Sequence, residues 1–356
     1  MENIELFNEY YKKIKNELEK NINEFNNALK NNKNGYLKEN LELFTNLNSD
    51  GKLVRAFLIT LGYKVAKNKK VEYSYPLAVA YELFQTSVLI HDDIIDNDNL
   101  RRGKETIHYH HFKKNKKYNL EDSINLGKSL AICMGDYGFF EANKLIINNY
   151  SNDENFSRIF DYYNDVVLRT IEGELIDVHL SFDGRYKLNK TNIKDNVMLV
   201  YKLKTAYYTI IGPLSLGLIL GGVNNTNLES VKSFGEKIGI AFQIQDDILG
   251  IYNDMGKVIG SDIKEYKQTI LFSYVIENKK YKDELLKYYG KKNLTKKDLL
   301  AVRKIFNESG AYTYACDLMN KLYDDATEEI DNVNWINDNE KNILKGFIEY
   351  LRNRNK

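Results

Sequence analysis

Two groups of aspartates stand where apolar, helix-like segments end. Asp92 and Asp93 follow an apolar run, and Asp96 comes four residues after Asp92. In a helix this spacing places two side chains on one face, about 6 Å apart along the axis. Carboxylates this close repel each other unless a cation lies between them, and Mg²⁺ is a hard cation that prefers oxygen ligands. The pattern indicates a metal site, although a solvent-exposed acidic helix end would explain it better if it stood alone.

A second acidic group, Asp246 and Asp247, ends another apolar run of helical period. Basic residues follow both groups, namely Arg101 and Arg102, and then Lys257 and Lys267. An arginine pair suits the bidentate binding of phosphate. Two helices that each offer aspartates and then cations can face each other across a bundle core. The sequence therefore predicts a site for a polyphosphate complexed with Mg²⁺.

Smaller basic elements add to this set. Lys52 and Arg55 are three residues apart, hence on one helix face, and Lys204 precedes Thr205 at the edge of an apolar segment. Alone, the first pair would be a helix start on the surface, and Lys204 a lysine whose stem packs on apolar neighbours. Together they supply cations for two anionic ligands. Histidines 108, 110 and 111 have no partners at zinc spacing, which predicts a polar helix surface.

The elements that must position these groups are helices. The 356 residues include 2 prolines, where an average usage of about 5 % would give roughly 18. Because proline interrupts helices, its scarcity predicts long ones. Apolar residues recur every three or four positions, and Thr295 with Asp298 forms a helix-start signal. We expect about a dozen helices, essentially no sheet and one domain, in which residues 1–40 are a helical extension of residues 41–356.

Charge and composition exclude several classes of protein. Lys and Arg number 51 against 50 Asp and Glu, a net charge of +1, so no overall field attracts nucleic acid. Cys133 and Cys316 match no metal-ligand spacing, and the N-terminus lacks a signal-peptide pattern, which predicts a cytoplasmic protein. The apolar run 208–223 is short for a membrane span and contains Pro213, so a buried core helix is expected.

These motifs resemble those of the trans-isoprenyl diphosphate synthases, of the polyprenyl or geranylgeranyl type. Residues 92–96 with 101–103 are similar to the family's first aspartate-rich motif, and residues 242–247 to its second. Further family motifs occur in order: Gly51, Lys52 and Arg55; Gly135 and Asp136; Gly173, Glu174 and Asp177; Lys204 and Thr205; and the loop from Gly256 to Thr269. The similarity covers roughly residues 40 to 354.

The resemblance implies an all-α, isoprenoid-synthase-like bundle of antiparallel helices around a deep central cavity, usually a homodimer. It implies a Mg²⁺-dependent polyprenyl diphosphate synthase, a prenyltransferase of isoprenoid biosynthesis that joins isopentenyl diphosphate to an allylic diphosphate. Product release would allow transient contact with a membrane. The resemblance assigns the metal to Asp92, Asp96 and Asp246, supported by Asp93 and Asp247. It assigns the allylic diphosphate to Arg101, Lys204, Gln243, Lys257 and Lys267, and isopentenyl diphosphate to Lys52, Arg55 and Arg102; Gln85 and Thr205 complete the substrate-binding set.

The chain departs from the family pattern at several positions. Gln85 replaces a histidine that contacts isopentenyl diphosphate, Gly250 the third aspartate of the second motif, and Tyr266 a glycine of the lysine loop. Ala56 and Glu105 stand where the family usually has proline. Tyr266 puts the closure of that loop in question.

Product length depends in this family on bulk just before the first motif. Here Ser87 occupies the fifth position before the motif, with Val88 beside it. Side chains this small at the bottom of the product tunnel favour a product longer than farnesyl. Phe84, about two turns below Asp92, is expected to close the tunnel at geranylgeranyl length. The prediction is geranylgeranyl diphosphate or longer, with some farnesyl release.

Three alternatives share these features. A regulatory subunit of a heteromeric synthase would have lost one aspartate motif, and both persist here. A terpene cyclase or a peptide prenyltransferase would not need Lys52, Arg55 and Arg102 for isopentenyl diphosphate. A plain acidic metal-binding bundle would not need the interleaved cations.

Overall fold

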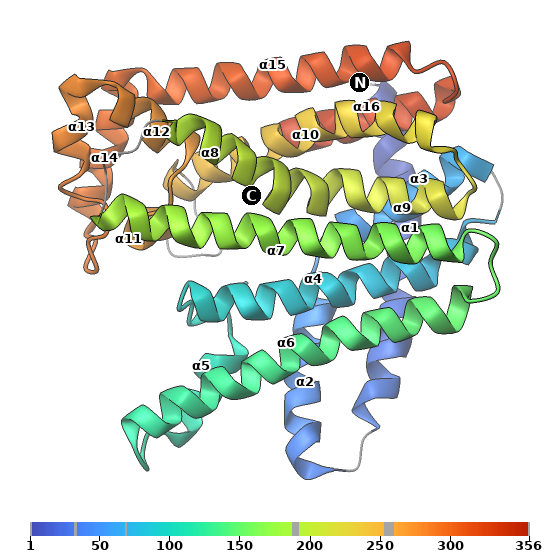
Figure 1. The fold of residues 1–356 in the computed structure, drawn as a ribbon, viewed down its shortest axis with the longest axis horizontal. Helices are drawn as coiled ribbons and strands as arrows, with labels where there is room; N and C mark the ends of the chain where they lie inside the picture. The colour runs from blue at the N-terminus through green and yellow to red at the C-terminus, as the bar shows by residue number, and fades with distance from the viewer. Residues whose placement is uncertain (1, 32–33, 68–69, 187–191, 253–259, 355–356) are drawn as a thin grey trace. The chain divides into compact units, whose positions relative to one another are not determined.

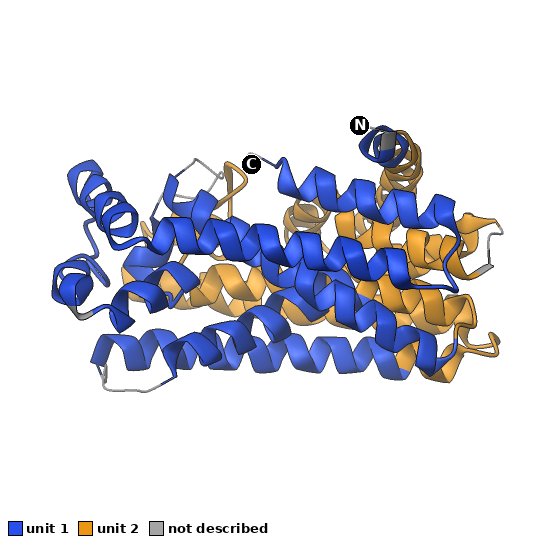
Figure 2. Ribbon diagram, turned by 90° about the horizontal axis from the view of Figure 1, so that it is seen from above, with its two compact units in different colours: residues 1–8, 161–212, 224–356 blue, residues 9–160, 213–223 orange. Residues whose placement is uncertain are grey.

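The computed structural model describes residues 2–31, 34–67, 70–186, 192–252 and 260–354, and these are helical nearly throughout (Figure 1). This confirms the all-helical prediction. The chain forms two compact units (Figure 2). Unit 1 comprises residues 1–8, 161–212 and 224–356, and unit 2 comprises residues 9–160 and 213–223. An extension of residues 1–40 on a domain of residues 41–356 remains a prediction.

Unit 2 contains most of the N-terminal helices and one small hairpin. Its elements are α1 (Glu2–Lys30, from residue 9), α2 (Gly35–Ser49), α3 (Val54–Lys67), the 3₁₀ turn η1 (Val71–Ser74), α4 (Tyr75–Ile95), β1 (Leu100–Arg101), β2 (Lys104–Glu105), α5 (Ile107–Asn115), α6 (Leu120–Tyr150) and most of α9 (Gly212–Leu220). Helix α4 packs against α3 and α6. Its core side chains are apolar and fully buried, among them Tyr81, Leu83 and Phe84.

Helix α4 approaches α6 closely because α6 has glycines at the contact. A Cβ atom on Gly135 would lie 2.2 Å from Nε2 of His91, and one on Gly138 would lie 2.2 Å from Oγ of Ser87. A larger residue at either position would displace the facing side chain or separate the two helices. Helix α4 begins with proline in its first turn and ends before Asn97, whose φ of 53° is left-handed. This end point places the first aspartate motif in the last turn of α4.

A hairpin with two residues in each strand follows that motif, and a sheet this small agrees with the prediction of essentially no sheet. Leu100 pairs with Glu105, and Arg101 pairs with Lys104. The two linking residues, Arg102 and Gly103, have φ values of 52° and 78°. Type I′ hairpin turns require positive φ at both positions, and a residue other than glycine loses about 1–2 kcal/mol there. The hairpin thus holds Arg102 in an unfavourable backbone conformation between the two strands.

The histidines of α5 correct another prediction. His108 and His111 are 8 % and 4 % exposed, so they do not form a polar helix surface. His111 Nε2 lies 2.9 Å from Oδ1 of Asn40, and His108 Nδ1 lies 3.2 Å from Oγ1 of Thr106. Each histidine is buried because a polar neighbour satisfies its ring nitrogen.

Unit 1 is built around α10. Its elements are α7 (Phe156–Tyr186, from residue 161), α8 (Ile193–Val200), the π-helix η2 (Tyr201–Ile211), α10 (Asn225–Tyr252), α11 (Ser261–Glu265), α12 (Ile270–Glu277), α13 (Lys279–Leu285), α14 (Lys296–Ser309), α15 (Ala311–Asn332) and α16 (Asp338–Arg352). Helix α10 packs against η2 and α15. At Gly239 a Cβ atom would lie 2.3 Å from Cα of Ala206, so α10 and η2 nearly touch. The predicted helix start at Thr295 is confirmed, because Thr295 and Asp298 form a capping box.

The helical stretch Ile193–Leu220 is long and apolar enough to cross a membrane, but 89 % of its apolar window is buried inside the protein. This confirms the prediction of a buried core helix. The helical stretch begins at Ile193, well before the apolar run of residues 208–223 on which the prediction was based. Its π-helical turns carry Lys204 and Thr205. Because π-helical turns are rare and frequently lie at functional sites, η2 is a candidate site element.

Candidate active site

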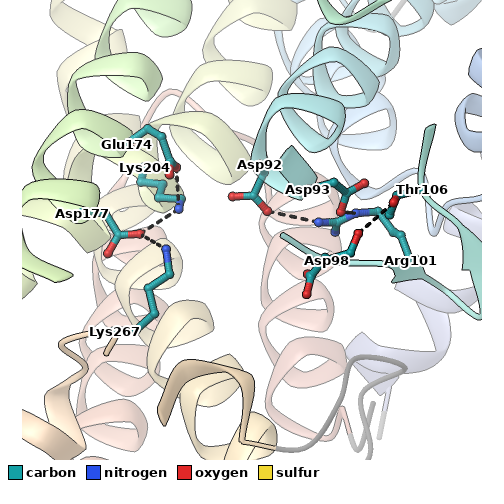
Figure 3. A network of polar contacts seen from close by, with 9 residues as sticks. All are labelled: Asp92, Asp93, Asp98, Arg101, Thr106, Glu174, Asp177, Lys204 and Lys267. Atoms are coloured by element: carbon teal, nitrogen blue, oxygen red, sulfur yellow. Dashed lines mark hydrogen bonds and ion pairs between the residues drawn. The ribbon is translucent and has the colours of Figure 1, made fainter. Parts of the chain in front are cut away.

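In unit 2, Arg101 joins the two neighbouring aspartates of the first motif (Figure 3). Its Nε donates to Oδ1 of Asp93 at 2.6 Å, and its Nη2 donates to Oδ2 of Asp92 at 3.1 Å. The side chain of Asp93 is 3 % exposed and that of Asp92 is 15 % exposed. Burial raises the pKa of Asp93 to about 7 even though Arg101 opposes this shift. Asp93 therefore faces inward and fixes Arg101, while Asp92 is the more accessible carboxylate.

A second group in unit 2 surrounds the buried carboxylate of Glu82, which is 4 % exposed. One Glu82 oxygen accepts the backbone N–H of Ala56 at 3.1 Å. With its amide oriented to suit both neighbours, Gln85 donates to the other Glu82 oxygen at 2.9 Å and accepts from Nη1 of Arg55 at 3.2 Å. Burial raises the pKa of Glu82, against the opposing charges of Arg55 and Arg102. Gln85 thus positions Arg55, and this group lies where the sequence predicts the isopentenyl diphosphate site.

Glu82 and Ala56 also explain one departure from the family pattern. A proline at position 56 has no N–H, so it could not donate to Glu82. Sequence reasoning missed Glu82, although a single carboxylate within the apolar run of α4 was a usable signal. Lys52 is exposed, and its carbonyl oxygen accepts a hydrogen bond from the hydroxyl of Tyr11.

In unit 1, Asp177 gathers the two lysines that the sequence assigned to diphosphate (Figure 3). Its Oδ2 lies 2.9 Å from Nζ of Lys204 and 2.9 Å from Nζ of Lys267. Glu174 pairs with Lys204 at 2.5 Å. Burial alone would raise the pKa of Asp177. The two lysine ammonium groups lower that pKa by more than burial raises it, so the net shift is downward. Asp177 is therefore ionised at neutral pH and holds two ammonium groups together.

Gly173 allows this arrangement, since a Cβ atom there would lie 2.6 Å from the backbone nitrogen of Lys204. The family motif of Gly173, Glu174 and Asp177 thereby acquires a physical role. The glycine brings α7 against η2, and the two acids bind the lysines. Sequence reasoning recognised the motif but assigned it no role.

The second aspartate motif lies near the end of α10. Asp247 is 4 % exposed, and it accepts hydrogen bonds from the hydroxyl of Tyr201 and, at 2.8 Å, from Nε2 of Gln243. Thr205 in turn donates to Oε1 of Gln243 at 2.6 Å. Burial raises the pKa of Asp247 well above its usual value, and the charge of Asp262 adds to this. Gln243 and Thr205, which the sequence assigned to substrate, therefore also anchor Asp247.

Asp246 faces outward by comparison, since its side chain is 30 % exposed. It forms an ion pair with Arg354, whose guanidinium lies 4.2 Å from the ring centre of Phe242. Asp92 and Asp246, both assigned as metal ligands by the resemblance, therefore each form an ion pair with an arginine.

Asp262 lies close to Gly250, the residue that stands where the family has the third aspartate of its second motif. A Cβ atom on Gly250 would lie 3.4 Å from Oδ2 of Asp262, and the N–H of Gly260 donates to the Gly250 carbonyl at 3.1 Å. The short helix α11 thus brings another carboxylate beside the second motif. Sequence reasoning missed Asp262 because no spacing rule connects it to α10.

Tyr266 keeps the backbone conformation that glycine favours. Its φ is 64°, and its ring is 5 % exposed. The ring packs edge-on against Phe272 and Tyr289, with centres 5.8 and 5.5 Å apart. Burying an aromatic ring offsets the roughly 1–2 kcal/mol of left-handed strain at this position. Lys257 and Gly256 lie outside the described residues.

The chain-length candidates lie on α4. Phe84 is fully buried and contacts the rings of Tyr81 and Phe139, with centres 5.2 and 5.8 Å apart. Ser87 is also fully buried, faces Gly138 of α6, and donates to the Leu83 carbonyl at 3.0 Å. Val88 is half-buried. Their effect on product length stays a prediction.

The donor set suits Mg²⁺. Among the described residues, no three acidic, histidine or cysteine side chains converge to hold a metal by themselves. Mg²⁺ in phosphate-transfer sites is typically bound by one or two carboxylates plus water and substrate phosphate oxygens, so converging protein ligands are not required. Asp92, Asp96 and Asp246 offer hard carboxylate oxygens, and two of them already attract cationic guanidinium groups.

Comparison with known proteins gives consistent results. The model of the family described as polyprenyl synthetase matches residues 37–307. The chain is 29 % identical over 321 residues to a geranylgeranyl diphosphate synthase from Sulfolobus acidocaldarius, covering 88 % of this chain and 89 % of the relative. It is 31 % identical over 244 residues to a short chain isoprenyl diphosphate synthase from Methanothermobacter thermautotrophicus, covering 67 % of each.

A solved structure shares the fold. The geranylgeranyl pyrophosphate synthase from Corynebacterium glutamicum, complexed with isoprenyl diphosphate and magnesium, superimposes with a TM-score of 0.86. The match covers 95 % of this chain and 97 % of that one at 24 % identity.

Proposed function

This chain belongs to the polyprenyl synthetase family and is a prenyltransferase that lengthens prenyl chains head to tail, and we propose that it joins isopentenyl diphosphate to an allylic diphosphate to give geranylgeranyl diphosphate or a longer product. The observation that best supports this reaction is that Asp177 holds Lys204 and Lys267 side by side. Two fixed ammonium groups on one carboxylate suit a polyanionic leaving group. The names of the relatives support the product length.

Asp92, Asp96 and Asp246 are proposed to hold Mg²⁺, whose dependence is general in this family. When bound, Mg²⁺ supplies positive charge that stabilises the departing diphosphate. Lys204, Lys267 and Arg101 are proposed to bind the same diphosphate. Because Asp93 and Asp177 fix these cations before substrate arrives, little reorganisation is needed as charge develops.

Ionisation of the allylic diphosphate leaves a carbocation, and the double bond of isopentenyl diphosphate attacks it. A new C–C bond forms, and a proton then leaves, proposed to go to the released diphosphate. No protein nucleophile is needed. Arg55, positioned by Gln85 and Glu82, is proposed to bind isopentenyl diphosphate together with Lys52 and Arg102. This cationic group favours a diphosphate acceptor over a peptide acceptor or cyclisation.

The homodimer is proposed to form through α7. Apolar side chains recur every three or four residues along one face of this helix and are 40–58 % exposed: Leu168, Ile171, Leu175, Val178 and Phe182. A helix face of this kind is buried by another protein surface. A second copy of the chain is the proposed occupant. Light scattering should show a dimer that Leu175→Glu dissociates, whereas a monomeric wild type would reject the proposal.

A cytoplasmic location is also proposed, with transient membrane contact on product release. Its support is that Cys133 and Cys316 are both free thiols, as expected in a reducing compartment.

The decisive experiment is to incubate the purified chain with isopentenyl diphosphate, Mg²⁺ and each allylic primer in turn, and to separate the products by chain length. We expect a C20 or longer product from farnesyl diphosphate. A regulatory subunit would give no elongated product with any primer. For product length, Phe84→Leu should lengthen the product, and Phe139→Leu tests whether the neighbouring ring shares this role. An unchanged distribution in Phe84→Leu would place the floor elsewhere.

A further inference from the structure

The last residue of α16 and the two residues that follow it lie on the second aspartate motif. Nε2 of Gln245 donates to the carbonyl oxygens of Arg352 and Arg354, at 3.2 Å in each case. The guanidinium of Arg354 lies over the ring of Phe242, 4.2 Å from its centre, and forms an ion pair with Asp246. Three neighbouring residues of the motif therefore hold one short segment of chain, which we call the C-terminal strap (residues 352–354).

The two arginines of the strap differ in their surroundings. Arg354 is 10 % exposed, and its partner is the carboxylate assigned to the metal. Arg352 is 35 % exposed, and it pairs with Asp324, a surface carboxylate that is 68 % exposed. Each guanidinium lies over an aromatic ring, that of Arg352 at 5.5 Å from the ring centre of Tyr323, so burial is what distinguishes the two pairs. An ion pair screened by solvent contributes little, while one that is largely buried contributes more. Of the two guanidinium groups, only that of Arg354 pairs with a carboxylate of the second motif.

We propose that Arg354 is an internal competitor for the metal at Asp246, so that the strap must release this carboxylate before a divalent cation can bind there. This inference rests on the proposed function, which makes Asp246 a metal ligand. A carboxylate engaged by a guanidinium offers less negative charge to a second cation. The apparent metal affinity is then the intrinsic affinity multiplied by the fraction of molecules in which Asp246 is released.

The test compares two variants that remove the same charge from the same strap. Mn²⁺ is titrated alone into wild type, Arg354→Ala and Arg352→Ala, and the free ion is followed by its EPR signal. Arg354→Ala should bind the tightest site about three- to tenfold more tightly, as expected when roughly 70–90 % of the wild-type molecules hold the pair. Arg352→Ala should match wild type. Equal affinity in Arg354→Ala and wild type would overturn the proposal.

Release of the strap has a second readout. Trypsin cleaves after arginine, so a docked strap protects the bonds after Arg352 and Arg354. Cleavage there should accelerate on addition of Mn²⁺ to wild type, and it should be fast without metal in Asp246→Ala. Slower cleavage in the presence of Mn²⁺ would contradict the proposal.

Asp246→Ala also separates this inference from the proposed function. If that variant binds Mn²⁺ as wild type does, Asp246 is not a ligand, and the metal assignment fails. If it loses a binding site while Arg354→Ala behaves as wild type, only the competition fails. Arg354→Lys keeps a cation and should lie between wild type and Arg354→Ala; an affinity above that of Arg354→Ala would count against the competition.

Discussion

The two aspartate motifs share a sequence pattern but hold their inner carboxylates differently. In each, the second aspartate is buried and the first is more exposed: Asp93 against Asp92, and Asp247 against Asp246. Asp93 is held by the cation Arg101, whereas Asp247 is held by the neutral donors Tyr201 and Gln243.

The difference has an electrostatic consequence. Burial raises the pKa of both inner carboxylates, to about 7 for Asp93 and well above the usual value for Asp247. A cationic partner favours the ionised form, and a neutral donor favours it less. The first motif therefore depends on a charge pair, while the second tolerates a protonated carboxyl. Both outer aspartates pair with a guanidinium group, but only the first motif has a cation on its inner aspartate as well.

The largest effect should come from the outer aspartates, for which the two motifs are equivalent. Asp92→Ala or Asp246→Ala should lower turnover about 10³-fold or more, because each removes a proposed metal ligand at a developing charge. Steady-state kinetics at saturating substrate would measure this. Asp283→Ala, a change on α13, serves as the control. Near-normal turnover in either variant would refute the corresponding metal assignment.

The next largest effect, a loss of stability in Arg101→Gln, should distinguish the first motif from the second. Arg101→Gln leaves Asp93 buried without its cation, which should cost about 3 kcal/mol of unfolding free energy at pH 8. The folded-state pKa of Asp93 is raised, so its contribution to stability is full below about pH 4 and is lost as pH rises through about 7. Without Arg101 that pKa rises further. The cost of Arg101→Gln should therefore be smaller at pH 5 than at pH 8, as urea unfolding at both values would show. An equal cost at both would mean that Asp93 stays ionised throughout.

Tyr201→Phe tests the second motif in the same way. It removes one neutral donor from Asp247 and the acceptor for the N–H of Ile270, which lies 2.8 Å from the Tyr201 oxygen. Loss of these buried hydrogen bonds should cost about 1–3 kcal/mol. Because this change removes a neutral donor and leaves the charges around Asp247 unaltered, the cost should depend less on pH between 5 and 8 than the cost of Arg101→Gln does. A strong pH dependence would make the two motifs alike.

Sequence reasoning predicted what local patterns determine. Helical period and scarce proline gave the all-helical fold, and the ordered motifs gave the family. The position of the hairpin was not predicted because strands of two residues have no period. Asp262 and Arg354 were missed because each reaches its site through tertiary packing, whereas Glu82 was an isolated carboxylate in the apolar run of α4 that the sequence did show. Spacing rules cannot detect a pair separated by 108 residues, as Arg354 and Asp246 are.

A third buried carboxylate, Glu82, extends the comparison because it has partners of both kinds. It accepts the neutral N–H of Ala56, and the charges of Arg55 and Arg102 act on it as well. Ala56→Pro would remove the neutral donor alone. Position 56 lies in the first turn of α3, where proline fits the backbone.

Ala56→Pro should therefore have the smallest effect. Losing a hydrogen bond to a buried carboxylate costs about 1–2 kcal/mol, and the stiffer unfolded chain returns up to about 1 kcal/mol. The net loss in unfolding free energy should be under about 1.5 kcal/mol, measured by urea unfolding. Because Glu82 positions Gln85 and thereby Arg55, the KM for isopentenyl diphosphate should rise more than that for the allylic substrate. An equal rise in both KM values would mean that Glu82 supports the fold without selectively positioning the acceptor site.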